Sequence, residues 1–116
     1  MRSLETLSTI KDSDAVDNIR LLTACFVERV KPLKVVLFGS FANGTYTDES
    51  DYDFYIVMGD DTKDLADVTT RAYRSIRRLK RRPVDIVIGT ESRFDERKHL
   101  PTVENEVFRK GVLLYG

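Results

Sequence analysis

The apolar positions in the first half of the chain predict one helix followed by two strands. Residues 1–12 are polar and mixed, and we expect a frayed start there. A helix is predicted from Ser13, a residue that can cap it, to the break at Pro32. Its apolar positions recur at helical spacing: Val16, Ile19, Leu22, Phe26 and Val30. Two β-rich apolar runs predict two strands. The first, "KVVLFG" (34–39), ends in glycine, and the second, "DYDFYIVM" (51–58), is followed by glycine.

The second half of the chain repeats the alternation of helix and strand. Apolar residues at helical spacing predict a helix over roughly 63–80, which must end there because Pro83 forces the residue before it out of helical geometry. "VDIVI" (84–88) predicts a third strand, followed by a polar turn. Pro101 suits the first position of a last helix, which leaves "VLLY" (112–115) as a final extended piece. This order predicts a small α/β (α+β) domain, in which helices cover one mixed sheet.

Length and composition limit the range of functions. With 116 residues, the chain is expected to form a single domain over residues 1–116, with any substrate in a surface cleft or against a partner. The net charge is zero, so no global field indicates nucleic acid or a membrane. A single cysteine, Cys25, permits no internal disulfide and no cysteine-based metal site. No signal pattern and no apolar run of about 18 residues occurs, so we expect a cytoplasmic protein.

Two aspartates lie at the start of the second predicted strand. Side chains alternate along a strand, so Asp51 and Asp53 are expected on one side, about 7 Å apart. Carboxylates at that separation repel each other unless a cation lies between them, and such oxygen ligands suit Mg²⁺. A solvated strand end with two exposed aspartates is the alternative.

A third carboxylate strengthens the hypothesis of a metal site. Asp85 interrupts the apolar run of the third predicted strand, where burial on both faces would make a lone aspartate costly. If this strand lies beside the strand of Asp51, Asp85 can face the same site. The alternative is an aspartate at a sheet edge, paired with an arginine.

The end of the first predicted strand has the composition of a phosphate cradle. Gly39 and Ser40 follow the apolar run and precede "FANG", which indicates a tight turn from strand to helix. Glycine lets the backbone approach a ligand closely, and a helix N-terminus offers free N–H groups to an anion. A triphosphate needs both such a cradle and cations that bridge its oxygens to the protein.

The glycine turn and the three aspartates together resemble a known pattern. It consists of Gly39-Ser40, ten intervening residues, Asp51-Tyr52-Asp53 and the later Asp85. This spacing is similar to that of the DNA polymerase beta-like nucleotidyltransferase superfamily, and the short chain resembles its minimal nucleotidyltransferase (MNT) family. The resemblance covers about residues 16–115. It implies the nucleotidyltransferase fold and transfer of a nucleoside monophosphate from a triphosphate, with ATP as the expected substrate, to a hydroxyl acceptor.

The resemblance also assigns roles to residues. Asp51 and Asp53 would bind two Mg²⁺ ions, Asp85 would help to activate the attacking hydroxyl as a third metal ligand, and Gly39 and Ser40 would hold the β- and γ-phosphates. Asn43 belongs to the same nucleotide-binding segment, and it stands where many relatives have arginine.

Minimal nucleotidyltransferases are commonly partnered with HEPN proteins, which are small helical toxins with ribonuclease activity. The resemblance therefore implies an antitoxin that interacts with a HEPN-type partner, in some relatives by transfer of AMP to a tyrosine of the toxin. Association with further copies of the chain is left open.

The sequence is also compatible with two other functions. The domain can be a binding module that neutralises a partner by contact, with nucleotide as a ligand only. The basic run Arg71–Arg82 can instead indicate nucleic acid, although Arg71, Arg74 and Arg78 share one helical face that can equally meet solvent, an acidic partner or a substrate phosphate. His99, the single histidine, has no partner at the spacing of a zinc site.

Overall fold

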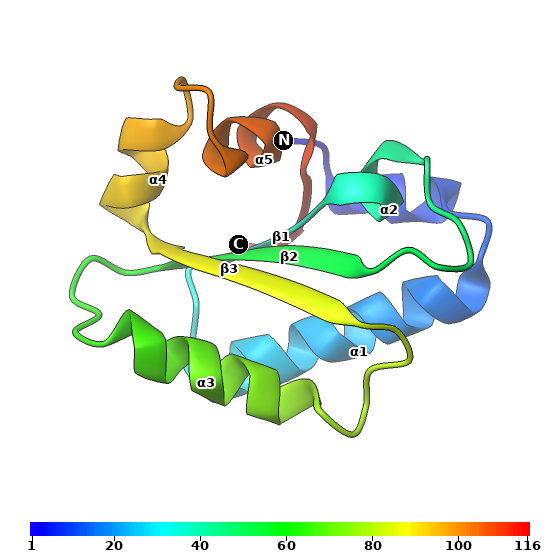
Figure 1. The fold of residues 1–116 in the computed structure, drawn as a ribbon, viewed down its shortest axis with the longest axis horizontal. Helices are drawn as coiled ribbons and strands as arrows, with labels where there is room; N and C mark the ends of the chain where they lie inside the picture. Colours follow the sequence, from blue (N-terminus) through cyan, green and yellow to red (C-terminus); the bar gives the residue numbers. More distant parts are fainter.

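A four-stranded mixed sheet forms the centre of the computed structural model, which describes residues 1–116 (Figure 1). Its strands are β1 (Lys34–Phe38), β2 (Tyr52–Met58), β3 (Val84–Thr90) and β4 (Val112–Tyr115), in the spatial order β3-β2-β1-β4. β1 is antiparallel to β2 and to β4, whereas β2 and β3 are parallel. The predicted α+β class with a mixed sheet is confirmed.

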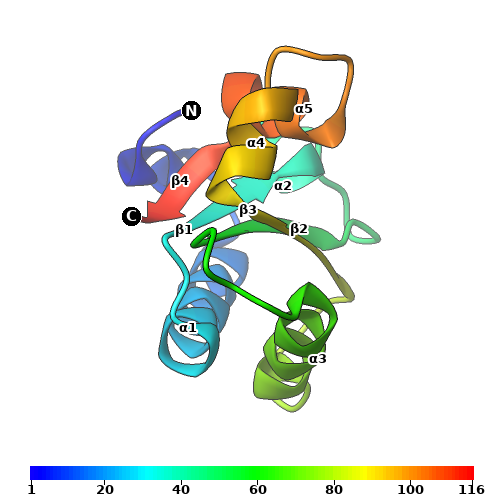
Figure 2. The same ribbon diagram turned by 90° about the vertical axis from the view of Figure 1, so that its left-hand side faces the viewer.

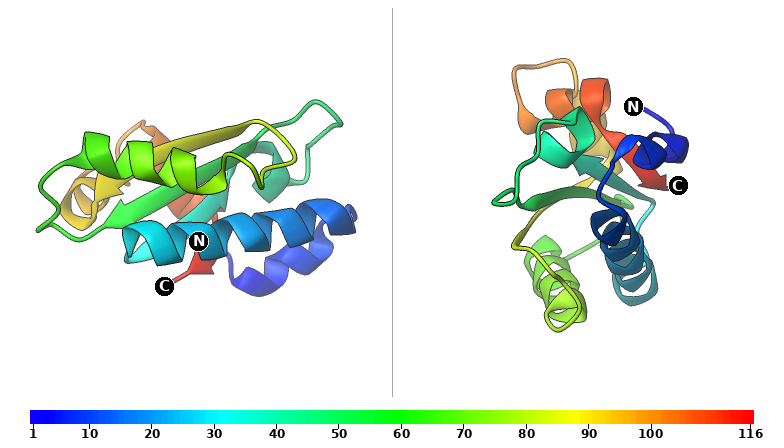
Figure 3. Two further views of the ribbon diagram at one scale, coloured as in Figure 1. Left: turned by 90° about the horizontal axis from the view of Figure 1, so that it is seen from below. Right: turned by 90° about the vertical axis from the view of Figure 1, so that its right-hand side faces the viewer.

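Helices cover both faces of this sheet (Figure 2). α1 (Ser13–Val30) and α3 (Leu65–Ile76) lie side by side and antiparallel across one face (Figure 3). α4 (Glu91–Arg97) and α5 (Val103–Lys110) lie on the other face. On that same side, the short helix α2 (Gly39–Asn43) stands at the end of the sheet where β2 and β3 begin (Figure 1).

The alternation of side chains along the central strand β2 builds two cores. Phe54 and Ile56 are fully buried in the larger core, against α1 and α3. Tyr55 and Val57 belong to the smaller core, on the side of α4 and α5. Because Asp53 has the same parity as Tyr55, it belongs to the face of α4 and α5, at the end of the sheet.

The N-terminal segment differs from the frayed start that we expected. Leu4–Thr9 form a 3₁₀ helix, and Leu7 is completely buried in the larger core. Arg2 forms a β-bridge to Val112, so the two ends of the chain lie together. The prediction failed because Leu7 is buried by distant parts of the chain, which a single apolar residue in a polar stretch does not indicate.

The second long helix is shorter than predicted. α3 ends at Ile76, and residues 77–79 form turns instead of continuing the helix to Lys80. The side chain of Asn18 in α1 donates to the Leu79 carbonyl at 2.9 Å and accepts from the Arg81 N–H at 3.0 Å. These two bonds tie the segment to α1 in a non-helical conformation.

The region between β3 and β4 holds two helices where one was expected. The supposed polar turn contains α4, capped by the Thr90 side chain, which accepts from the Arg93 N–H. Phe94 is its only buried residue, so the sequence has no apolar periodicity to reveal it. The next helix is capped by Thr102, which places Pro101 before the helix and not at its first position. No helix of the chain combines the length and the apolar character needed to cross a membrane.

Candidate active site

Two of the three predicted carboxylates are brought together by strand pairing. β2 and β3 begin at the same end of the sheet, and Asp53 lies opposite Asp85 in their parallel register. The strand of Asp85 therefore lies beside the strand that follows Asp51, as the hypothesis of a shared site requires. Asp53 is half-buried, whereas Asp85 is exposed because β3 is the edge strand of the sheet. The expectation that Asp85 is buried on both faces of its strand is wrong.

Asp51 lies just outside the strand where it was expected. β2 begins at Tyr52, so Asp51 is the last residue of the preceding loop, and it is half-buried. None of the ion pairs of the structure involves Asp51, Asp53 or Asp85. The end of the sheet therefore carries three carboxylates that no basic side chain of the chain neutralises.

Burial and the nearby negative charges change the acidity of the central carboxyl group. Burial raises the pKa of Asp53 from 3.8 to about 6, and the negative charges of Asp85, Asp51 and Glu106 contribute to the same shift. Glu106, in α5, is a fourth acidic residue near the site that the sequence did not indicate. Its nearness results from the packing of α5 above the sheet, which no spacing in the sequence reveals.

Gly39 approaches the same carboxylate from the other side. Its φ angle is +74°, in the left-handed region, and a Cβ atom built on it would lie 2.2 Å from Asp53 Oδ2. Only glycine fits such a contact without displacement of the carboxylate. Ser40, the next residue of α2, is half-buried, and Asn43, the last, is exposed. No side chain caps the N-terminus of α2, so its first N–H groups have no side-chain acceptor.

The loop that joins α2 to β2 is held by one arginine that the sequence had assigned only to a basic run. Nη1 of Arg82 donates to the carbonyl oxygens of Thr47, Asp48 and Ser50 at 3.0, 3.1 and 3.1 Å. Its Nη2 lies 3.6 Å from Asp12 Oδ2, in the cap of α1. A single guanidinium group thus fixes the turn immediately before Asp51.

Aromatic contacts complete this attachment of the loop. The Arg82 guanidinium lies 4.9 Å from the centre of the Phe41 ring in α2, and Phe41 stacks on Tyr46 with the ring centres 4.5 Å apart. The Tyr46 hydroxyl accepts from the Lys11 N–H at 3.2 Å. These contacts hold the segment between Gly39 and Asp51 as a spacer of defined structure between the glycine turn and the acidic pair.

A buried polar network supports the sheet beside the site. Tyr55, two residues after Asp53, donates to Glu104 Oε2 at 2.8 Å, and Arg97 Nε lies 3.0 Å from Glu104 Oε1. The Glu104 side chain is 2% exposed. Burial alone would raise the pKa of Glu104, but the hydrogen bonds from Tyr55 and Arg97 outweigh it and hold the pKa below its ordinary value. This carboxylate is fully satisfied, unlike those of the site.

The donor set at the end of the sheet fits a divalent cation in its chemistry. Asp51, Asp53 and Asp85 supply only hard oxygen ligands, and no basic side chain of the chain forms an ion pair with them. The structure does not gather three acidic, histidine or cysteine side chains into one ready-made ligand cluster. Two carboxylates with further oxygens from water and substrate are nevertheless the usual protein contribution to a Mg²⁺ site.

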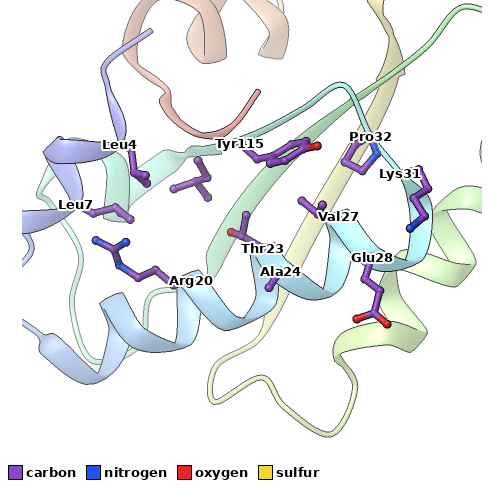
Figure 4. Close-up of a pocket in the computed structure, with 11 residues that line it drawn as sticks. Leu4, Leu7, Arg20, Thr23, Ala24, Val27, Glu28, Lys31, Pro32 and Tyr115 are labelled. Atoms are coloured by element: carbon purple, nitrogen blue, oxygen red, sulfur yellow. The ribbon is translucent and has the colours of Figure 1, made fainter.

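The largest groove of the surface, about 830 Å³, lies elsewhere. It runs between the N-terminal 3₁₀ helix, α1 and the end of β4, and Leu4, Leu7, Val27 and Tyr115 are among its lining residues (Figure 4). The carboxylates form no part of it. The candidate site lies instead at an end of the sheet, where β2 and β3 begin.

A model of a known family matches most of the chain. The family model described as a nucleotidyltransferase domain matches residues 19–114. No curated protein is a significant match to the chain.

Two crystal structures share the fold, each with 20% sequence identity and a TM-score of 0.56. One is a toxin-antitoxin with AMP-PNP, and the match covers 86% of this chain and 73% of that one. The other is a proposed nucleotidyltransferase from Sulfolobus solfataricus, and the match covers 95% of this chain and 83% of that one.

Proposed function

Because the chain belongs to the nucleotidyltransferase domain family, we propose that it transfers a nucleoside monophosphate from a triphosphate, ATP in the first instance, to a hydroxyl acceptor. The observation that carries the proposal is that Asp53 lies opposite Asp85 in the register of β2 and β3 and also lies against Gly39. This arrangement supports a site in which two carboxylates hold a cation beside a backbone turn that would bind phosphate. In the transfer, the acceptor oxygen forms a bond to the α-phosphorus, and the bond from that phosphorus to the oxygen bridging the α- and β-phosphates breaks. Pyrophosphate leaves with the electron pair.

Each site residue has a role in this reaction. Asp51, Asp53 and Asp85 would hold Mg²⁺, which, when bound, stabilises the attacking and leaving oxygens of an in-line displacement. Gly39 and Ser40 would bind the β- and γ-phosphates through backbone N–H groups and the serine hydroxyl. Asp85, exposed at the sheet edge, is open to the acceptor and would orient its hydroxyl and take up its proton.

Asn43 would contribute a neutral donor to the phosphates, where many relatives have a cation. Two nearby guanidinium groups are otherwise engaged, since Arg82 holds the loop before Asp51 and Arg2 donates to the Ala42 carbonyl at 2.5 Å. The triphosphate charge would therefore be neutralised mainly by the bound cations. Under this proposal, nucleotide binding depends strongly on divalent metal.

The acceptor in this proposal is a protein, with a tyrosine of a HEPN-type toxin as the specific candidate, and the chain acts as its antitoxin in the cytoplasm. The similarity of fold to a toxin-antitoxin crystallised with AMP-PNP supports a protein partner and a nucleotide ligand. The location of the site at an end of the sheet supports it too. A domain of this size offers little surface of its own for acceptor specificity, so a docked protein would supply the rest.

A second candidate function is a weakly catalytic nucleotide-binding module that neutralises its partner by contact. Asn43 favours this candidate, because a missing cation beside the triphosphate would lower transfer more than binding. Both candidates use the same site. They differ in whether pyrophosphate is released.

Transfer of radioactive AMP from α-labelled ATP, with Mg²⁺ and the partner encoded beside this chain, tests the proposal. We expect labelled partner and stoichiometric pyrophosphate with the wild type, and loss of both in Asp53→Asn. Asp17→Asn, an exposed residue of α1, is the matched control and should retain full transfer. Tight partner binding without pyrophosphate would establish the second candidate. Undiminished transfer by Asp53→Asn would contradict the metal assignment.

A further inference from the structure

The outer side of α3 and the turn after it form a strongly basic surface. We call it the basic face, and it consists of Arg71, Arg74, Arg77, Arg78, Lys80 and Arg81, all of them exposed. Val68, Ala72 and Ile76 fix the orientation of α3, because they are buried against the sheet and α1 and leave the cations outward. A chain with zero net charge therefore concentrates positive charge on α3 and the turn that follows it.

Few of these charges are neutralised within the chain. Arg71 pairs with Asp67 at 3.0 Å and donates to the Arg29 carbonyl, but no other member of the basic face takes part in an ion pair. Cations near the C-terminus of a helix are favourable, yet that effect needs only one or two of them. The remaining guanidinium groups are available to a partner.

Two hollows flank Arg74 and give the basic face a shape that can receive side chains. One of about 340 Å³ is lined by Arg29, Arg71, Arg74 and Ser75, without any apolar residue. The other, of about 410 Å³, lies towards β3 and is lined by Thr70, Tyr73, Arg74, Ile76, Arg77 and Lys80. Carboxylates that enter these hollows would find guanidinium donors on more than one side.

The composition of the basic face is that of a protein interface. Five of its six cations are arginine, and Tyr73 and Leu79 are exposed among them, at 39% and 41%. Arginine and tyrosine are enriched at protein interfaces, whereas lysine, the usual cation of a solvated surface, is depleted there. Buried Tyr and Arg also dominate the measured binding energy of such interfaces.

The basic face reaches the candidate active site along the edge strand. The Tyr73 hydroxyl accepts from the Ile86 N–H at 2.9 Å, and Ile86 follows Asp85 directly. Figures 1 and 3 show α3 running beside β3, with its C-terminal end towards the beginning of that strand. A partner seated on the basic face would therefore extend past the exposed Asp85.

We propose that the basic face docks an acidic surface of the protein acceptor and thereby brings the acceptor hydroxyl to Asp85. This inference rests on the proposed function, and it names the chemistry of the acceptor. Nucleic acid fits less well, because its phosphates would continue into the unneutralised carboxylates of Asp51, Asp53 and Asp85. The face also has one exposed aromatic ring, Tyr73, whose hydroxyl is already engaged with β3, whereas single strands need several for stacking.

The test uses a random copolymer of glutamate and tyrosine, which supplies acidic side chains and a phenolic hydroxyl in one probe. We expect the wild type to bind this copolymer in a fluorescence assay, more weakly as salt rises from about 50 to about 300 mM. Arg74→Glu with Arg77→Glu should weaken binding at least about tenfold. Lys11→Glu with Arg20→Glu, the same change of charge at exposed positions elsewhere, should change it by less than about threefold.

Two further measurements keep the test decisive. Thermal melts of both double variants should match the wild type, and the milder Arg74→Gln with Arg77→Gln should weaken copolymer binding in the same direction. Poly(U) RNA serves as the competing probe. Absence of copolymer binding, equal loss in both double variants, or tighter binding of poly(U) that depends on Arg74 and Arg77 would each overturn the proposal.

Binding of a fluorescent ATP analogue separates this proposal from the proposed function. All the charge variants should bind the analogue as the wild type does. If the wild type binds the copolymer through the basic face but does not bind the analogue, the docking surface stands and the nucleotidyl transfer fails. The reverse result removes the docking surface alone.

Discussion

Two carboxylates on the same side of the sheet have opposite surroundings. Glu104 is buried, yet it receives hydrogen bonds from Tyr55 and Arg97, and its pKa is held below the ordinary value. Asp53, two residues before Tyr55 in β2, has no basic partner, and burial together with the nearby carboxylates raises its pKa to about 6. The hydrogen bonds to Glu104 offset the cost of burying its charge, so their removal is destabilising, whereas the charge of Asp53 keeps a desolvation cost and a repulsion that a bound cation can relieve.

The largest expected effect comes from removal of Glu104, the carboxylate whose hydrogen bonds are satisfied. Glu104→Ala removes both acceptors at once and leaves the Tyr55 hydroxyl buried without a partner. We expect a loss of about 3 kcal/mol in the free energy of unfolding, measured by urea denaturation at pH 7. Glu96→Ala, an exposed neighbour in α4, is the control and should lose less than about 0.5 kcal/mol. Equal losses would show that the network contributes nothing particular.

The second prediction concerns Arg82, which fixes the spacer between the glycine turn and the acidic pair. Arg82→Ala removes three hydrogen bonds to loop carbonyls, and we expect a loss of about 1–2 kcal/mol in the free energy of unfolding. Since the turn before Asp51 would then move, the affinity for a nucleotide analogue should fall about tenfold. Arg81→Ala, the exposed neighbour, should leave that affinity unchanged. A destabilised Arg82→Ala protein with normal nucleotide affinity would limit Arg82 to a structural role.

The third prediction concerns the addition of one methyl group beside the unpaired carboxylate of Asp53. Gly39→Ala places a Cβ against Asp53 Oδ2 at a φ angle that disfavours alanine. We expect a loss of about 1–2 kcal/mol in the free energy of unfolding and weaker nucleotide binding. Gly44→Ala has the same φ angle of +74° but open space around its Cβ, so it isolates the cost of the backbone alone. If the two variants behaved alike, the contact with Asp53 would have no consequence.

The last predicted effect is a gain in stability that disappears at low pH. The folded-state pKa of Asp53 lies above its ordinary value of 3.8, so the folded state binds the proton more tightly than the unfolded state does. The resulting destabilisation is complete above pH 7, shrinks as the pH falls through 6 and disappears below about pH 4. After allowance for partial exposure to solvent, Asp53→Asn should add about 1–2 kcal/mol at pH 8 and nothing below pH 4. A constant difference across this range would contradict the shift.

Local patterns were sufficient for much of the fold. The strands, α1 and the mixed sheet follow from apolar runs, glycine and proline, and the pairing of Asp53 with Asp85 follows once their strands are neighbours. The same patterns misplaced what depends on the edges of the sheet. Asp85 is exposed because its strand has one neighbour, a property of topology and not of the residues around it.

Distant contacts account for what the sequence did not indicate. α4 has a single buried residue, Phe94, so its helix rests on caps and on packing rather than on periodicity. Arg82 read as one cation of a basic run, although its guanidinium is bound to a loop more than thirty residues earlier. Glu106 comes near Asp53 only through the position of α5. Each of these roles requires the three-dimensional structure.

The most direct test of the central claim measures the binding of Mn²⁺, a spectroscopic substitute for Mg²⁺, together with a non-hydrolysable ATP analogue. Electron paramagnetic resonance detects the bound Mn²⁺. That claim is that the unneutralised carboxylates hold a divalent cation for the triphosphate. We predict stoichiometric binding of Mn²⁺ and analogue by the wild type and by Asp17→Asn, and loss of that binding in Asp53→Asn and Asp85→Asn. Mn²⁺ bound equally well by all four proteins would contradict the account.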